Sequence, residues 1–130
     1  MSEAALVLDA SALLAILGGE PGADEIPAGS VPIISAVNLL EVSIVLARRG
    51  ISARKASSIL DALALEVVPF EGALIERATT IHAKARDRGL SLGDAACLAT
   101  AHAHGATAWT ADRAWKGLEV GVAIRLLRAG

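Results

Sequence analysis

The sequence predicts an α/β fold: a three-layer α/β/α sandwich built on a mostly parallel sheet of about five strands. Short apolar runs alternate along the chain with longer amphipathic segments, a pattern typical of βαβ units. The apolar runs contain few polar residues, as expected for strands that helices cover on both faces. A chain of 130 residues without a linker, repeat or low-complexity segment is expected to form one domain, residues 1–130.

The N-terminal half is expected to alternate strands with helices and then to add one more helix. Gly18 and Gly19 end the first helix, and Ser35 and Ser52 are placed to cap the next two. Pro32 stands near the start of the second strand, where a sheet tolerates proline. The expected elements are a strand at 4–8, a helix at 11–17, a helical turn at 23–26, a strand at 31–34, and helices at 36–49 and 53–65.

The C-terminal half repeats the pattern. Gly89 and Gly105 end its two helices. Ser91 is placed to cap the second of them, with Asp94 three residues later in the capping-box position. The expected elements are a strand at 66–68, a helix at 71–88, a helix at 92–104, a strand at 106–110, a turn at 113–117 and a strand at 120–127.

Charge and cysteine content narrow the possible functions. Twelve basic and 14 acidic residues give a net charge of −2, which argues against binding nucleic acid by bulk charge alone. An enzyme that concentrates its acidic residues in one pocket stays compatible with this balance. The only cysteine, Cys97, excludes an internal disulfide and a cysteine-based metal site. On its alanine-rich helix we expect it to be a small buried side chain.

Apolar content predicts a particular kind of core. Phe70, Trp109 and Trp115 are the only aromatic residues, so the core is expected to consist of Ala, Leu, Val and Ile. No apolar run approaches the ~18 residues of a membrane span, and the start lacks the basic residues of a signal peptide. We therefore expect a cytoplasmic protein that does not bind membranes.

Four acidic residues are expected to meet at one edge of the sheet. Asp9 follows the first strand, Asp94 opens the helix at 92–104, and Asp112 follows the fourth strand. Glu41 lies on an apolar helix face with no Lys or Arg three or four residues away, so we expect its partner to come from elsewhere in the fold. Open α/β sheets hold their sites at the carboxyl ends of strands, which favours one shared site.

Each of these acidic residues also has an ordinary structural explanation. Asp9 and Asp112 fit turn or cap positions, and Asp94 fits a capping box favoured by the helix dipole. Glu41 could extend its side chain to solvent. These explanations account for the residues one at a time. They account less well for all four in one place.

Clustered carboxylates indicate a hard divalent cation. They raise one another's pKa, and a cation removes that penalty. Oxygen ligands without His or Cys suit Mg²⁺ or Mn²⁺, which can activate water for attack on a phosphate. Nearby polar and basic residues are candidates for supporting the acidic residues or for contacting a phosphate, although several also fit ordinary caps or turns: Ser11, Asn38, Thr110, Arg113 and Lys116.

At these residues the sequence resembles the PIN-domain family, and within it the VapC toxins of toxin–antitoxin pairs. Four pieces carry the resemblance, in the family's order and with comparable spacing: VLDASAL at 7–13, SAVNLLEV at 35–42, LGDA at 92–95 and TAD at 110–112. Each piece alone is weakly specific, but together they span nearly the whole chain. None of the four acidic positions departs from the family pattern.

The resemblance implies a metal-dependent ribonuclease that cuts single-stranded RNA. It implies that Asp9, Glu41, Asp94 and Asp112 form the acidic site for Mg²⁺ or Mn²⁺, with Asp9 and Asp94 as the most direct ligands. It further implies a homodimer and a VapB-like antitoxin that inserts a side chain near the metal. This is the function we expect first: an endoribonuclease toxin acting through metal-activated water.

Two other functions are compatible with the sequence. One is a catalytically idle PIN-fold scaffold that acts through its dimer and antitoxin surfaces. The other is a receiver-like or dehalogenase-like phosphoryl-transfer domain, which fits less well. Ser11 stands where the dehalogenase pattern has a second Asp, and the strand at 66–68 lacks an aspartate to accept phosphate. No Walker or Rossmann glycine pattern is present.

Overall fold

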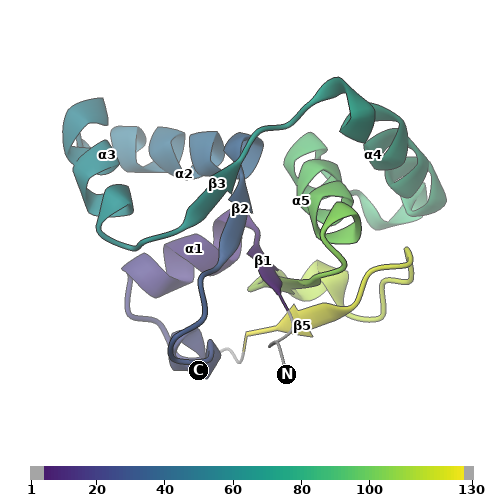
Figure 1. Cartoon of the computed structure of the whole chain (residues 1–130), viewed down its shortest axis with the longest axis horizontal. Helices are drawn as coiled ribbons and strands as arrows, with labels where there is room; N and C mark the ends of the chain where they lie inside the picture. The colour runs from purple at the N-terminus through teal and green to yellow at the C-terminus, as the bar shows by residue number, and fades with distance from the viewer. Residues whose placement is uncertain (1–4, 128–130) are drawn as a thin grey trace.

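The computed structural model describes residues 5–127 as one five-stranded sheet flanked by helices (Figure 1). The strands follow the order β3-β2-β1-β4-β5, and every neighbouring pair is parallel. This confirms the predicted α/β fold and its mostly parallel sheet. The strands are β1 Leu6–Leu8, β2 Ile33–Ser35, β3 Glu66–Val68, β4 Thr107–Thr110 and β5 Ile124–Leu126.

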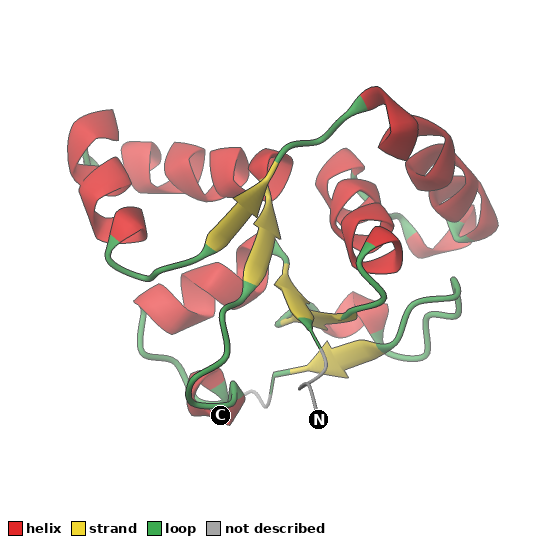
Figure 2. Ribbon diagram, in the orientation of Figure 1, coloured by secondary structure: helices red, strands yellow, loops and turns green. Residues whose placement is uncertain are grey.

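Helices cover both faces of the sheet. One face carries α1, α2 and α3, and the opposite face carries α4 and α5, so the sheet is the middle of three layers (Figures 1 and 2). The helices are α1 Ala10–Leu17, α2 Ala36–Arg48, α3 Ala53–Asp61, α4 Gly72–Lys84 and α5 Leu92–Ala103. Three short 3₁₀ helices join them: η1 Ala23–Glu25, η2 Arg86–Arg88 and η3 Arg113–Trp115.

Alternate side chains of the central strand enter two separate apolar cores. Val7 packs with residues of α4 and α5, whereas Leu6 and Leu8 pack with residues of α1, α2 and α3. All three side chains are buried. Successive side chains of a strand point to opposite faces, so a strand between two helical layers must be apolar at every position. This explains the uninterrupted apolar run that the sequence shows here.

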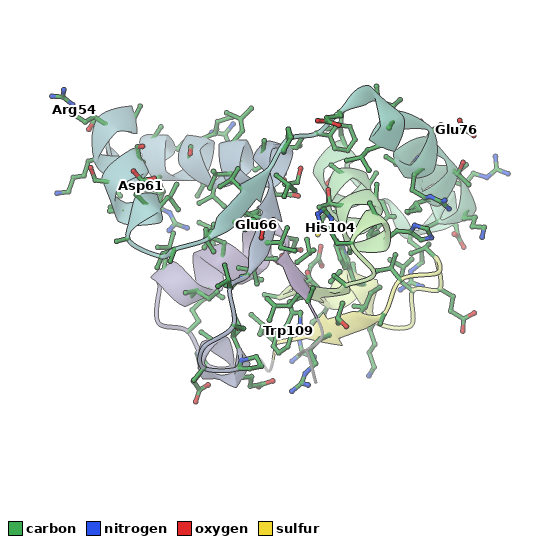
Figure 3. All side chains as sticks on the ribbon, in the orientation of Figure 1. Arg54, Asp61, Glu66, Glu76, His104 and Trp109 are labelled. Carbon is green, nitrogen blue, oxygen red and sulfur yellow. The ribbon has the colours of Figure 1, made fainter. Side chains whose placement is uncertain are left out.

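Both tryptophans are buried in these cores, which corrects the prediction of a core made only of Ala, Leu, Val and Ile. Trp115 is 1% exposed and is the largest of the fully buried side chains. Trp109, labelled in Figure 3, is buried on the other face. Its ring centroid lies 5.0 Å from Cζ of Arg125. Alanine-rich helices leave volume that small side chains do not fill, and close packing requires a large ring there.

The predicted serine caps are confirmed. Ser35 Oγ accepts a hydrogen bond from Val37 N at the start of α2, and Ser52 Oγ accepts one from Lys55 N at the start of α3. Each cap satisfies a backbone N–H that has no partner within its helix. These helix starts are therefore encoded locally.

Three predicted elements extend four residues beyond the end or the start that the structure shows. α3 ends at Asp61 instead of 65, and Ala64 has a φ of 52°, which a right-handed helix excludes. α4 ends at Lys84 instead of 88, where the chain tightens into η2. β5 begins at Ile124 instead of 120, because Gly121 has a φ of 78° that no extended strand adopts.

The described residues, 5–127, contain no helix both long and apolar enough to cross a membrane. The first strand begins at Leu6, and residue 4, where the sequence predicts its start, lies outside the described residues.

Candidate active site

The order of the strands reverses beside β1. From β1 the sheet continues to β2 and β3 on one side and to β4 and β5 on the other. Open α/β sheets bind ligands at such a reversal, just beyond the carboxyl ends of the strands. Asp9 follows β1 directly, and Thr110 is the last residue of the neighbouring β4. The topology thus brings together two residues that are 101 positions apart in the sequence.

Asp9 is the most enclosed acidic residue of the site, at 3% exposure. Its Oδ1 accepts hydrogen bonds from Ser11 Oγ at 2.7 Å and from Ala12 N at 2.8 Å, and its Oδ2 accepts one from Thr110 Oγ1 at 2.5 Å. The bond from Ala12 makes Asp9 the N-cap of α1, so the ordinary explanation of this residue also holds. Ser11 and Thr110, both predicted to support the acidic residues, contact Asp9 directly.

Burial raises the pKa of Asp9 from 3.8 to about 6. The hydrogen bonds from Thr110, Ala12 and Ser11 lower this pKa, and the charge of Asp94 raises it further. Hydrogen bonding therefore offsets only part of the burial penalty on the charged form. At neutral pH the fold keeps a carboxylate where ionisation is unfavourable, an arrangement common at functional sites.

Asp94 stands at the first turn of α5, in the predicted capping box. Its Oδ2 accepts a hydrogen bond from Ser91 N at 2.9 Å, and its backbone N donates to Ser91 Oγ at 3.1 Å. Within the described residues its Oδ1 accepts no hydrogen bond. The capping box thus fixes the orientation of the carboxylate and leaves one oxygen available.

Glu41 lies half-buried on α2, and its immediate partner is one turn away on the same helix. Asn38 Nδ2 donates to Glu41 Oε1 at 2.8 Å and to the carbonyl oxygen of Gly93 at 3.0 Å. The prediction that the partner of Glu41 comes from elsewhere in the fold is therefore wrong. A neutral amide three residues earlier also satisfies a carboxylate, and a search for Lys or Arg alone does not find it. Asn38 itself is buried, as a predicted site residue should be.

Gly93 belongs to the site, and the sequence reasoning did not identify it. A Cβ built on Gly93 would lie 2.6 Å from Cδ of Glu41, far inside van der Waals contact. The carboxylate of Glu41 therefore occupies the space that any other residue at 93 would fill. The sequence does contain a signal for this contact, namely a glycine in the first turn of a helix. Alanine favours helix formation more than glycine does, so a glycine there indicates a close neighbour.

Asp112 is joined to the other site residues mainly by its backbone N–H. Its N–H donates to Thr110 Oγ1 at 3.0 Å, and its Oδ1 accepts from Ala114 N at 2.9 Å, which caps η3. The Thr110 hydroxyl thus joins Asp112 to Asp9. The carboxylate of Asp112 is exposed, however, and its charge is not among those that act on Asp9. It is the least enclosed of the four predicted acidic residues.

The two predicted basic residues, Arg113 and Lys116, lie on η3 and directly after it, and both are exposed. Arg88, at the end of η2, donates to the carbonyl oxygens of Ala114 and Lys116 at 2.8 Å and 2.5 Å. This pair of hydrogen bonds joins the segment that carries the two basic residues to the end of η2. The side chains of Arg113 and Lys116 are thereby carried beside Asp112 on an anchored backbone.

Three of the four carboxylates act electrostatically on one buried thiol. Cys97 is fully buried, and burial, followed by the charges of Asp9, Asp94 and Glu41, raises the pKa of its thiol well above the usual range. The prediction of a small buried side chain at 97 is confirmed.

The donor set suits Mg²⁺ or Mn²⁺ better than a metal that needs a preformed cage. Within residues 5–127, no three His, Cys, Asp or Glu side chains are arranged so that they could hold an ion together. Mg²⁺ is usually held by only one or two carboxylates and keeps several waters. Oδ1 of Asp94 and Oε2 of Glu41 accept no hydrogen bond in the described residues, and Asp9 keeps acceptor capacity, so the chemistry of these oxygens fits such an ion.

Comparison with known families shows which one the chain belongs to. The PIN-domain family profile matches residues 6–120. The chain belongs to the PIN-domain family. The prediction made from the four motifs is confirmed, and this PIN domain is neither receiver-like nor dehalogenase-like. A comparison with curated proteins finds no significant sequence match.

Solved structures similar to this PIN domain include toxin–antitoxin proteins. VapBC2 from Rickettsia felis, bound to a DNA fragment from its promoter, has a TM-score of 0.74 and 16% identity over 95% of this chain and 98% of that chain. A toxin–antitoxin complex from Klebsiella pneumoniae has a TM-score of 0.74 and 19% identity over 97% and 100%. VapC20 from Mycobacterium tuberculosis, a sarcin–ricin loop cleaving toxin, has a TM-score of 0.70 and 22% identity over 89% and 98%.

Thr110→Val tests the hydroxyl that joins Asp9 to Asp112 without changing side-chain shape much. Loss of its hydrogen bonds is expected to raise the pKa of Asp9 further and to lower the free energy of unfolding at pH 8 by about 1–3 kcal/mol. Urea unfolding at pH 5 and pH 8 measures this, with a smaller loss at pH 5, where Asp9 is protonated. Thr107→Val, at the other end of β4, is the matched control. An equal loss in both variants would contradict the assigned role.

Proposed function

We propose that this PIN domain is the toxin of a type II toxin–antitoxin pair, an Mg²⁺- or Mn²⁺-dependent endoribonuclease that acts in the cytoplasm. The observation that carries the proposal is the buried carboxylate of Asp9 at the strand-order reversal, with its pKa raised by burial and by Asp94. A divalent cation removes that penalty. The structurally similar VapC20 cleaves the sarcin–ricin loop, which supports RNA as the substrate class.

The four acidic residues have two kinds of role in this proposal. Asp9 and Asp94 would hold the ion most directly, and Glu41 and Asp112 would complete the pocket. Ser11 and Thr110 keep the carboxylate of Asp9 oriented, because each donates a hydrogen bond to a different oxygen of it. When bound, the ion supplies activation of water and stabilises negative charge on the phosphate. Hydrolysis adds water across a phosphodiester P–O bond, so one new end carries the phosphate and the other a hydroxyl.

The phosphate backbone of RNA would approach from the side of η3. Arg113 and Lys116 are exposed there, next to Asp112, while the chain as a whole carries a net charge of −2. A locally basic rim beside an acidic pocket attracts the RNA backbone without bulk positive charge. The shortage of exposed aromatic side chains favours backbone contacts over base stacking.

A VapB-like antitoxin and a second copy of the chain are the proposed partners. The similar structures from Rickettsia felis and Salmonella typhimurium are VapBC complexes, which supports an antitoxin. An apolar groove of about 670 Å³ lies among α2, α4 and α5. Ile75 and Leu92 line it and are 57% and 77% exposed. Exposed apolar surface of this kind is typical of a protein interface.

Incubating the antitoxin-free protein with total cellular RNA tests the activity. Discrete cuts are expected with Mg²⁺ or Mn²⁺ and none with EDTA, and mapping the new ends by sequencing identifies the RNA. Folded protein that binds Mn²⁺ and leaves all RNA intact would overturn the nuclease proposal. Titration of Mn²⁺ in parallel verifies that the metal is bound.

A catalytically idle scaffold is the second candidate. The observation that favours it is that no three acidic side chains of residues 5–127 are placed to share an ion. A scaffold acting through its antitoxin and dimer surfaces would bind a VapB-like partner without metal-dependent turnover. The cleavage experiment separates the two candidates directly.

A further inference from the structure

The carboxylate of Glu41 is packed against the backbone of the first turn of α5. The ideal Cβ position on Gly93 lies 2.6 Å from Cδ of Glu41, and Gly93 is itself buried. Gly93 is not among the glycines with positive φ, so its backbone conformation is open to any residue. Glycine also weakens a helix relative to alanine. Close approach of Glu41, and not backbone conformation, accounts for the glycine at this position.

Asn38 also bonds to this carboxylate. Its Nδ2 donates to Glu41 Oε1 and to the carbonyl oxygen of Gly93, so one amide joins α2 to α5. Because the amino group donates to both of these oxygens, the orientation of the Asn38 amide is determined. As a result Asn38 Oδ1 is buried without a partner in the described residues. A buried acceptor without a partner is unfavourable, so this orientation is not explained by stability.

We propose that Gly93 and Asn38 are positioning residues that fix the Glu41 carboxylate beside Asp94, an arrangement we call the Glu41 latch. The inference rests on the proposed function, because it assigns Glu41 to the metal-binding pocket. A free glutamate side chain samples many rotamers, whereas the Glu41 latch restricts it before an ion arrives. Gly93, against which the Glu41 carboxylate lies, directly precedes Asp94, so the Glu41 latch holds this carboxylate at the turn of α5 that carries Asp94.

The alternative role of Gly93 is packing alone. A small residue also lets two helices approach closely, and α2 and α5 are in contact. The Glu41 latch predicts that substitutions at 93 act through Glu41. A packing role predicts that they act whether or not Glu41 is present.

Gly93→Ala is the direct test, read out by calorimetric titration with Mn²⁺ and by the Tm of the metal-free protein. Its Cβ is expected to displace the flexible carboxylate of Glu41 and to weaken Mn²⁺ binding by about 10- to 100-fold. The Tm should change little, because only the end of one side chain has to move. Gly72→Ala is the matched control: Gly72 also lies in the first turn of a helix and has no atom near its Cβ position. It should bind Mn²⁺ as the wild type does.

The same substitution in a Glu41→Ala background separates the two roles. There Gly93→Ala is expected to leave Mn²⁺ affinity unchanged and to raise the Tm more than it does in the wild type, because nothing opposes the new methyl group. Asn38→Ala should likewise weaken Mn²⁺ binding only when Glu41 is present. Equal loss of affinity in both backgrounds, or no loss in either, would overturn the Glu41 latch.

Failure of the proposed function gives a different result. If the wild type binds no Mn²⁺, the metal-dependent proposal is wrong, and the Tm values alone decide whether Gly93 and Glu41 are coupled. A Tm gain from Gly93→Ala that is the same with and without Glu41 would then exclude the contact.

Discussion

Replacing Asp9 by asparagine is expected to lower the rate of RNA cleavage about a thousand-fold or more. Loss of a metal-binding carboxylate removes several kcal/mol of stabilisation of the transition state, and each 1.36 kcal/mol is a factor of ten. Asparagine keeps an acceptor for Ser11 and Ala12, so α1 retains its cap. The measurement is the cleavage rate of the mapped RNA at saturating Mn²⁺.

Asp61→Asn is the matched control for this loss. Asp61 is exposed at the end of α3, on the face of the sheet opposite α5, and its substitution removes the same charge from the chain. The Asp61→Asn variant should cleave RNA at the wild-type rate. Appreciable cleavage by Asp9→Asn would show that the buried carboxylate does not take part in the reaction.

The metal-free protein is expected to lose stability as the pH rises from about 4 to about 7. The ordinary pKa of an aspartate side chain is 3.8, and in the folded protein the pKa of Asp9 is about 6. Between these values the folded state binds more protons than the unfolded state, so the free energy of unfolding falls with increasing pH. A shift of this size contributes about 3 kcal/mol to the free energy of unfolding. This contribution is fully present below pH 4 and is lost as the pH rises above the pKa of Asp9 in the folded protein.

Comparison with Asp9→Asn isolates this effect from all other titrating groups. Urea unfolding of both proteins at several pH values should show Asp9→Asn gaining on the wild type as pH rises. Mn²⁺ should restore stability to the wild type at pH 7.5 and have little effect at pH 4.5, where Asp9 is protonated. A difference between the two proteins that does not change with pH would contradict the assigned pKa.

Much of the fold could be predicted because its signals lie close together in the sequence. An apolar run such as 6–8 is readable as a buried strand, since both faces of the central strand are covered. Serine caps at Ser35, Ser52 and Ser91 are readable because a cap and its partner lie two or three residues apart. The errors fall at element ends such as Ala64 and Gly121, where positive φ values stop the pattern.

The sequence predicts candidate acidic residues for the site but not the contacts that hold them. Asp9 and Asp94 were identified because each stands at the end of a strand or the start of a helix. The amide of Asn38 as the partner of Glu41, and the space left by Gly93, were not predicted. The space left by Gly93 depends on how α2 and α5 approach each other. The bond from Asn38 lies within α2, at a spacing where a search for Lys or Arg alone does not find it.

By itself the sequence determined the order of strands and helices, their caps, the PIN-domain motifs and the identity of the acidic residues. These follow from periodicity and from interactions between residues a few positions apart. Only the tertiary structure decided that Thr110 bonds to Asp9 across 101 positions, that Asp112 stays exposed, and that burial raises the pKa of Asp9. The physical reason is that burial and electrostatic fields arise from atoms that are close in space, and the chain brings them together only when it folds.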